Sequence, residues 1–185
     1  MTKLFLYIRV LVLFLIVSLG FCSTLYAELQ ITKVSKNDGS FDVVLNDDIK
    51  ISNIILKNNE IEFPVYKDKN KVYKQFSILK REFRQYVVDS LIENKISSKT
   101  TDTSFKINKF SILENHKTIK VFASVIFNDD IEVECRIMRS KNCLWVAWPA
   151  NKNNNIWVKD FKFINRNLKE TIEKKLITDY TSISG

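Results

Sequence analysis

Two Asn-Asp-Asp triplets hold the carboxylates that recur along this sequence. Asp47 with Asp48, and Asp129 with Asp130, each follow an apolar segment that resembles a strand. Neighbouring carboxylates can bind a cation or act together as an acid and a base. Asn and Asp between two strands are also the residues that tight turns prefer. We favour the turn interpretation, and we expect no metal ion and no cofactor.

Other residues that often carry catalysis lack partners here. His116 is the sole histidine, so it cannot anchor a His-based triad or a cluster of His ligands, and we expect it in a solvated loop. No glycine lies between Gly39 and Gly185, which excludes a glycine-rich phosphate loop in that range. The sequence therefore indicates a protein that is not an enzyme.

The cysteines of the second half of the chain are not expected to form a disulfide. A hairpin that turns near Ser140 and Lys141 would place Cys135 opposite Val146. The thiols of Cys135 and Cys143 would then lie several rungs apart on opposite faces, beyond bonding distance. Because Cys135 alternates with apolar residues, we expect it to fill the core rather than to react.

A basic and aromatic tract after Pro149 is the best candidate for binding. Cations can follow a phosphate backbone while an aromatic ring stacks on a base. The alternative is a solvated helix face beside core aromatics, and the interspersed Asp160, Glu170 and Glu173 favour it. The residues expected to contact nucleic acid or another partner are Lys152, Trp157, Lys159, Lys162, Arg166 and Lys169.

The net charge is concentrated in the second half of the chain. The whole chain carries +8, and residues 28–185 carry +6. Residues 28–97 contribute +1 of this charge, whereas residues 98–185 contribute +5. The chain is also rich in Lys, Asn and Ile, all of which have AT-rich codons, so genome composition explains part of the surplus. Any basic surface is expected mainly in the second half.

The strands and helices that would position these residues are encoded by two copies of one sequence pattern. The only two prolines, Pro64 and Pro149, lie 85 residues apart, and eight of the 33 positions in 61–93 are identical at this offset. Around the Asn-Asp-Asp triplets the offset is 82. A three-residue shift is a loop-length difference that two copies of one fold tolerate.

Hydrophobic periodicity predicts the same elements in both copies. In the second copy, strands are expected at 105–112, 119–127, 131–138 and 144–148, followed by a polar loop at 151–155, an extended stretch at 156–164 and a helix capped by Asn165. In the first copy, strands are expected at 31–35, 41–45, 49–56 and 60–63, with a helix at about 79–93. The predicted class is α+β, with each repeat a small antiparallel β-sheet followed by an amphipathic helix.

The N-terminus has the composition of a targeting segment. Residues 1–27 combine Lys3 and Arg9 with an apolar run and a more polar exit, which is the order of a secretory signal peptide. We expect export to the periplasm or cell envelope with cleavage after Ala27, or retention of the segment as an anchor. Cys22 raises the alternative of a lipoprotein. Phe21 argues against it, because it occupies the position before the cysteine where Gly, Ala or Ser would be expected. The expected organisation is residues 1–27 as signal or anchor, 28–94 as repeat one, 95–104 as linker and 105–182 as repeat two.

The second copy resembles the SpoVG family of sporulation and septation proteins. The resemblance rests on the strand ending in Phe127-Asn-Asp-Asp130, the segment Leu144 to Pro149, and a helix with Ile172 and Tyr180. It implies a small sheet with a C-terminal helix, dimers, and non-enzymatic nucleic-acid binding linked to septation and gene regulation. The first copy looks like a diverged member.

Two departures from the family pattern, together with residues 1–27, leave two functions open. Ala150-Asn151-Lys152 stands where the family has Ser-Arg-Lys, and Lys159 stands where it has Arg. One hypothesis is an exported or anchored protein that binds a protein partner at the cell envelope. The other is a nucleic-acid-binding regulator that uses the basic surface of repeat two. Because the family forms dimers, a chain with two copies is expected to form the pair within itself as a pseudo-dimer.

Overall fold

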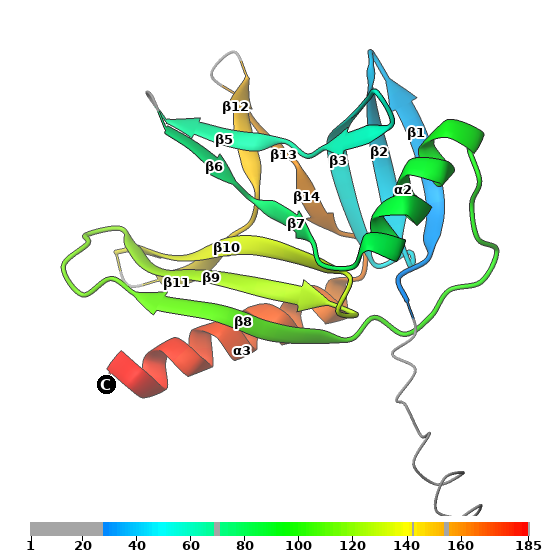
Figure 1. Cartoon of the computed structure of the whole chain (residues 1–185). Helices are drawn as coiled ribbons and strands as arrows, with labels where there is room; N and C mark the ends of the chain where they lie inside the picture. Colours follow the sequence, from blue (N-terminus) through cyan, green and yellow to red (C-terminus); the bar gives the residue numbers. More distant parts are fainter. Residues whose placement is uncertain (1–27, 69–70, 142, 154–155, 185) are drawn as a thin grey trace, which may run out of the picture.

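The computed structural model describes residues 28–68, 71–141, 143–153 and 156–184 (Figure 1). Seven strands and then a helix follow one another in the first half of this part of the chain, and the same order recurs in the second half. The first half contains β1 (Ile31–Asn37), β2 (Ser40–Leu45), β3 (Ile49–Lys57), β4 (Glu60–Glu62), β5 (Val65–Asp68), β6 (Lys71–Lys74), β7 (Phe76–Ile78) and α2 (Arg81–Glu93). The second half contains β8 (Phe105–Ile112), β9 (Ile119–Phe127), β10 (Ile131–Ser140), β11 (Cys143–Ala147), β12 (Ala150–Asn153), β13 (Ile156–Lys159), β14 (Phe161–Phe163) and α3 (Arg166–Ser184).

Asn, Asp and Gly make the tight turns that set the strand pairings. Asp38 and Gly39 connect β1 to β2 with φ of 36° and 84°. Asn58 and Asn59 connect β3 to β4 with φ of 51° and 60°. Two-residue hairpin turns need this left-handed backbone, which Gly and Asn adopt at least cost. The frequent Asn residues therefore do in this chain what glycine does in many others.

Each of two antiparallel sheets contains one strand from the opposite half. The first sheet has the order β1-β2-β3-β14 with β4 also on β3, and the second has β11-β10-β9-β8 with β7 on β10. Phe163 lies opposite Ile49 in the first sheet, and Ile78 lies opposite Ile131 in the second. These two pairs are equivalent at the offsets of 82 and 85 residues that the sequence shows. The exchange is therefore reciprocal and uses the same register in both directions.

The two helices pack against the sheets through apolar stripes at four-residue spacing. Phe83, Val87 and Leu91 of α2 are buried, and α2 contacts β1, β4 and β7. Ile172, Leu176 and Tyr180 of α3 are buried, and α3 covers the second sheet, where it contacts β8, β11 and β14 (Figure 1). The predicted cap of α3 is confirmed, because Asn165 Oδ1 accepts a hydrogen bond from Leu168 N at 3.2 Å. Helix α2 begins at Arg81, two residues after the predicted start.

The core runs continuously through both halves. Phe161 is 1% exposed, and its ring centroid lies 5.9 Å from that of Phe127 and 5.2 Å from that of Trp148. Phe76 of the first half joins the same cluster, with its ring 6.4 Å from Phe161. Rings at these distances pack favourably beyond the area they bury. The exchanged strands β7 and β14 thus bring their aromatic residues into a shared core.

The Asn-Asp-Asp triplets form turns, as the sequence predicts. Asn46 and Asn128 adopt left-handed φ values of 52° and 48°. Asn46 Oδ1 accepts a hydrogen bond from Gln30 N at 2.9 Å, and Asn128 Oδ1 accepts one from Ser104 N at 2.9 Å. Each turn therefore fastens the chain that enters the first strand of its own half.

The third residue of each triplet joins its half to the other one. The carbonyl of Asp48 accepts a hydrogen bond from Ile164 N at 2.7 Å, and that of Asp130 accepts one from Leu79 N at 2.8 Å. The turns thus hold the exchanged strands as well as reversing the chain. Among the residues described, no group of three or more His, Cys, Asp and Glu side chains is arranged to hold a metal ion.

The two equivalent aspartates have different side-chain partners. Asp130 is fully buried, accepts a hydrogen bond from Leu29 N at 2.8 Å, and lies 2.7 Å from Lys80 Nζ. Asp48 instead accepts a hydrogen bond from Asn165 Nδ2 at 2.8 Å near the surface. The hydrogen bond to Asp130 raises the pKa of Lys80 above its usual 10.5. The ion pair between Lys80 and Asp130 at one turn thus corresponds to a hydrogen bond between the Asn165 amide and Asp48 at the equivalent turn.

The α+β class and the antiparallel sheets are confirmed, whereas two hairpins were not predicted. The β5–β6 hairpin was missed, and Ala150–Asn153, within or beside the predicted loop 151–155, forms strand β12. Residues 95–104 contain no helix or strand, and Ser97 N donates to the carbonyl of Ile31 at 2.7 Å. The expected signal segment 1–27 lies outside the described residues. Of the helices that the structure describes, neither has the length and apolar character needed to cross a bilayer.

Candidate functional site

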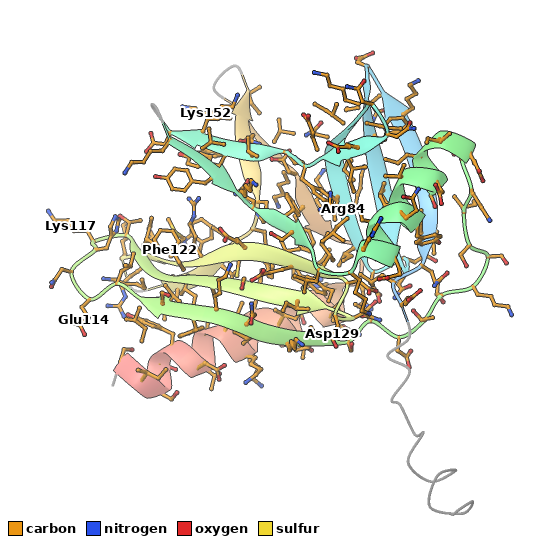
Figure 2. The ribbon with its side chains drawn as sticks, viewed as in Figure 1. Arg84, Glu114, Lys117, Phe122, Asp129 and Lys152 are labelled. Carbon is orange, nitrogen blue, oxygen red and sulfur yellow. The ribbon has the colours of Figure 1, made fainter. Side chains whose placement is uncertain are left out.

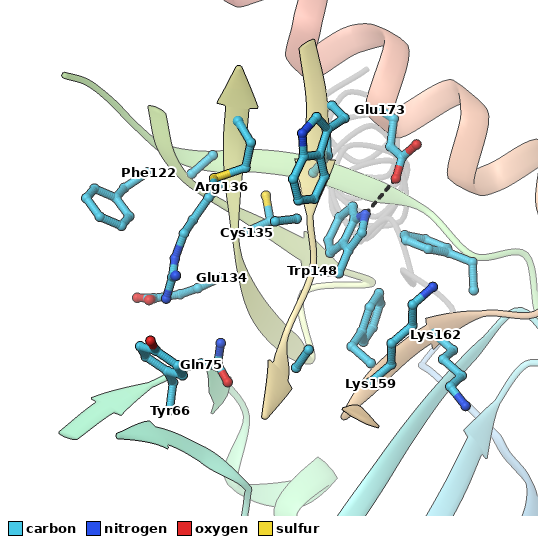
Figure 3. Close-up of a pocket in the computed structure, with 18 of the residues that line it drawn as sticks. Tyr66, Gln75, Phe122, Glu134, Cys135, Arg136, Trp148, Lys159, Lys162 and Glu173 are labelled. Atoms are coloured by element: carbon cyan, nitrogen blue, oxygen red, sulfur yellow. Dashed lines mark hydrogen bonds between the residues drawn. The ribbon is translucent and has the colours of Figure 1, made fainter. Parts of the chain in front are cut away.

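A groove of about 1000 Å³ lies between the β5–β6 hairpin of the first half and the sheet of the second half (Figure 3). We call it the groove and define it by its lining residues. The first half contributes Tyr66, Tyr73 and Gln75. The second half contributes Lys109, Ser111, Phe122, Ala123, Glu134, Cys135, Arg136, Met138, Trp145, Val146, Ala147, Trp148, Ala150, Trp157, Lys159, Phe161, Lys162, Phe163, Lys169 and Glu173. Its walls therefore require both halves of the chain.

Four of the six predicted binding residues line the groove. Trp157 and Lys159 come from β13, Lys162 comes from β14, and Lys169 comes from the first turn of α3. Strand β13 brings Trp157 and Lys159 to the same face because side chains two apart in a strand point the same way. The four residues therefore line one groove, and their role in binding stays a prediction.

The other two predicted residues lie outside the groove. Lys152 is exposed on β12, where it is paired with Trp157 across the hairpin, and Figure 2 shows it toward the outer end of that strand. Arg166 begins α3 and forms an ion pair with Glu170 at 2.7 Å. Exposed pairs of this kind contribute little to stability. Neither residue adds to the lining of the groove.

The charge of the groove is positive. Five of its lining residues are cations and two are carboxylates, Glu134 and Glu173. Lys109 lies 3.3 Å from Glu132 and 3.6 Å from Glu134, so its charge is largely compensated. Among the ion pairs of the described residues, none involves Lys159 or Lys162. These two lysines are therefore available to an anion.

The aromatic residues of the groove divide into a packed set and an exposed set. Trp148 and Phe163 pack edge to face with ring centroids 4.8 Å apart, and Trp148 Nε1 donates to Glu173 Oε1 at 2.8 Å (Figure 3). This set holds α3 against the sheet. The exposed set consists of Tyr73 at 41%, Phe122 at 43%, Trp145 at 48% and Trp157 at 60% exposure.

Arg136 spans the groove between residues of the two halves. Its guanidinium carbon lies 5.1 Å from the ring centroid of Tyr66 on β5 and 5.8 Å from that of Phe122 on β9. Both distances are within the range of cation–π attraction. The arrangement keeps a planar cation with several N–H donors at the wall of the groove.

The two cysteines among the described residues, Cys135 and Cys143, form no disulfide. Both thiols are free and Cys135 is buried, as the sequence predicted, and Cys143 is exposed. Burial, reinforced by Glu173 and Glu134, raises the pKa of the Cys135 thiol to about 12. The predicted hairpin register was wrong by two residues, because Ser140 lies opposite Cys143 and Val146 lies opposite Ile137 rather than Cys135. The conclusion about the disulfide does not depend on that shift.

His116 occupies an exposed loop position. Its Nδ1 accepts hydrogen bonds from Ile119 N at 2.9 Å and from Thr118 N at 3.3 Å. The imidazole therefore shapes the loop before β9. The prediction of a solvated loop histidine is confirmed.

Sequence reasoning missed the residues that face the tract after Pro149. Tyr66 and Tyr73 lie on a hairpin that was not predicted, and Phe122, Arg136 and Trp145 lie on predicted strands whose partners across the groove could not be inferred. One signal was present in the sequence. Tyr66 and Tyr73 stand in the segment after Pro64 that corresponds to the tract after Pro149, so the repeat already pointed to this segment.

Comparison with known proteins finds a similarity to a protein family in the second half of the chain. Residues 100–182 match the model of the SpoVG family, which covers β8 to α3. No match was found among the curated proteins, and none among the solved structures. The matched region contains every groove residue of the second half and none of the first.

Proposed function

Residues 100–182 of this chain belong to the SpoVG family, a family of sporulation and septation regulators, and from this we propose that the protein is a non-enzymatic regulator that binds nucleic acid in the groove. The observation that carries the proposal is the coincidence of unpaired lysines and exposed aromatics along one groove. Lysines supply sequence-independent attraction to phosphates, and rings supply surfaces for bases. Lys152 matches the lysine of the family pattern, and Lys159 keeps a positive charge where the pattern has Arg, although it offers no planar guanidinium, whereas Asn151 is neutral where the pattern has Arg.

A charge-matched pair of variants tests this proposal. The core of the described residues begins at Leu29, so residues 28–185 contain the whole described fold and serve as the test protein. Lys159→Gln with Lys162→Gln removes two groove charges. Lys67→Gln with Lys74→Gln removes two charges from the β5–β6 hairpin outside the groove lining.

The groove variant should weaken binding of DNA or RNA and lower the salt dependence, by about 0.7 in the logarithmic slope for each lost contact to a single strand. The hairpin variant should change both quantities much less. Gel shifts and fluorescence anisotropy at several salt concentrations measure them. Absence of any salt-dependent binding at low ionic strength would end the proposal.

We also propose that the two halves are copies of one unit that pair within the chain as a pseudo-dimer. The reciprocal exchange of β7 and β14, in equivalent registers, supports it. The groove then needs no second chain, because its walls come from both copies. Light scattering of residues 28–185 should give a monomer, and an obligate homodimer would contradict this arrangement.

A second candidate function is favoured by the composition of residues 1–27. An exported or membrane-anchored protein would use the same groove for a protein partner at the cell envelope. Cell fractionation with mass analysis of the N-terminus tests it. A chain that begins at Glu28 outside the cytoplasm would support export, whereas an intact N-terminus in the cytoplasm would leave nucleic acid as the available partner.

A further inference from the structure

The exposed aromatic residues of the groove lie on separate strands that the fold brings together. Trp157 is on β13, Trp145 on β11 and Tyr73 on β6. None of them belongs to the packed cluster around Phe161. Large apolar rings left in water inside a concave surface cost free energy unless a ligand covers them. Their placement indicates a ligand with flat, stackable groups.

The cations of the groove add a second requirement. Lys159 and Lys162 have no acidic partner among the described residues. Lys169 Nζ lies 4.0 Å from Glu173 Oε1, which is a long distance for an ion pair. Arg136 stands apart from these lysines on β10 and is held by Tyr66 and Phe122 (Figure 3). The ligand must therefore carry negative charge along the same path as its flat groups.

The volume of the groove, about 1000 Å³, is at the upper end for small-molecule sites. Part of its boundary is open to solvent, so a segment of a longer chain can lie in it. A nucleic-acid duplex keeps the faces of its bases inside the stack and presents only phosphates and groove edges to a protein. Rings such as Trp157 and Trp145 cannot stack on those bases. A single strand presents both phosphates and base faces.

From these observations we propose that the groove binds single-stranded nucleic acid, with bases stacked on Trp157 and Trp145 and phosphates near Lys159 and Lys162. This inference rests on the proposed function and narrows its ligand. Arg136 contributes a planar cation between the two halves, where a base or a phosphate can contact it. The first half takes part through Tyr66 and Tyr73, although only the second half matches the family model.

The test uses residues 28–185 with a labelled oligothymidylate of about 16 nucleotides, the upper end of site sizes in single-strand grooves, and a duplex of the same length. We expect the single strand to bind at least about ten-fold more tightly than the duplex. Binding should quench tryptophan fluorescence. Trp157→Ala should weaken single-strand binding about ten-fold, which corresponds to about 1.4 kcal/mol.

Val72→Ala is the matched control. Val72 occupies the position equivalent to Trp157 on the β5–β6 hairpin, is also 60% exposed, and does not line the groove. It should leave binding unchanged. Both variants alter exposed positions, so both are expected to fold, and thermal unfolding checks this.

The outcomes separate this inference from the proposed function. Equal binding of duplex and single strand, weakened by the lysine variant but not by Trp157→Ala, would overturn single-strand stacking and leave nucleic-acid binding in place. Equal competition by polyglutamate would also overturn it, since a polyanion without bases would then suffice. Absence of binding to both nucleic acids at low salt would overturn both proposals.

Discussion

Asp130 and Asp48 occupy equivalent positions in the two turns, and we predict that the same substitution has unequal effects at them. In Asp130→Asn, the buried carboxylate that faces Lys80 Nζ at 2.7 Å and Leu29 N at 2.8 Å becomes an amide. The amide oxygen can still accept the hydrogen bond from Leu29. Its NH₂ group would then point at a lysine, which is also a donor.

The magnitude follows from burial. The Asp130 side chain is fully buried, so a buried donor without an acceptor costs about 1–3 kcal/mol, and loss of the charged partner of Lys80 adds to this. Lys80 is 33% exposed and can turn to water, which limits the second contribution. We therefore expect Asp130→Asn to lower the free energy of unfolding by about 3 kcal/mol. Asp48→Asn, whose partner is a surface amide, should cost less than about 1 kcal/mol.

Urea unfolding of residues 28–185 measures the difference. With a slope of about 1–3 kcal/mol per molar urea, the Asp130 variant should lose at least about 1 M in its midpoint. Circular dichroism and tryptophan fluorescence should give the same transition in each protein, which checks that unfolding is two-state. Equal losses for the two variants would refute the argument from burial.

Three further predictions concern charge, thiols and packing. The ion pair with Asp130 raises the pKa of Lys80 above 10.5, so the contribution of this pair to stability is complete below pH 10.5 and is lost as the pH rises through the pKa of Lys80 in the folded protein. Above pH 10.5, the urea midpoint should therefore fall more steeply in the wild type than in Lys80→Met. Parallel curves of midpoint against pH would contradict this. In folded residues 28–185 at neutral pH, an aromatic disulfide reagent should modify Cys143 and leave Cys135 unmodified until urea unfolds the protein. Rapid modification of both thiols in the folded protein would show that Cys135 is accessible. Phe161→Ala should lower the free energy of unfolding in urea by about 3–5 kcal/mol, because the ring is 1% exposed. Ile156→Ala, at a side chain that is 68% exposed, should lower it by less than about 0.5 kcal/mol. Similar losses for the two variants would count against the shared core.

Alternating sequence made most strands predictable, and its absence hid the others. Strand β9 was predicted at its observed bounds because apolar residues such as Val121, Ala123 and Val125 recur at every second position, and these three are buried. Every described side chain of β6 is exposed, so this strand has no buried apolar face to produce a pattern, and β13, which is equally exposed, was predicted only as part of the extended stretch 156–164. Hairpins that build the wall of a groove lack the burial on which sequence reasoning depends.

The exchange of strands could not be predicted from local sequence. Phe76 and Phe161 are equivalent residues, and β3 and β10 offer them equivalent edges, so periodicity is the same for either partner. Only packing of the whole molecule decides between them. The groove residues contributed by the first half were missed for the same reason, because Tyr66 meets Arg136 only after the exchange.

The position of β14 in the first sheet has a consequence for how the protein is made. Strand β3 ends at Lys57, yet its partner Phe161–Phe163 leaves the ribosome more than a hundred residues later. A chain emerging in order therefore cannot complete its first sheet during synthesis, and contacts so distant in sequence form slowly. The unfinished edge of β3 stays open in the nascent chain. The first sheet can be completed only when synthesis is nearly over. Until then, a chaperone that binds exposed strand edges can bind the edge of β3.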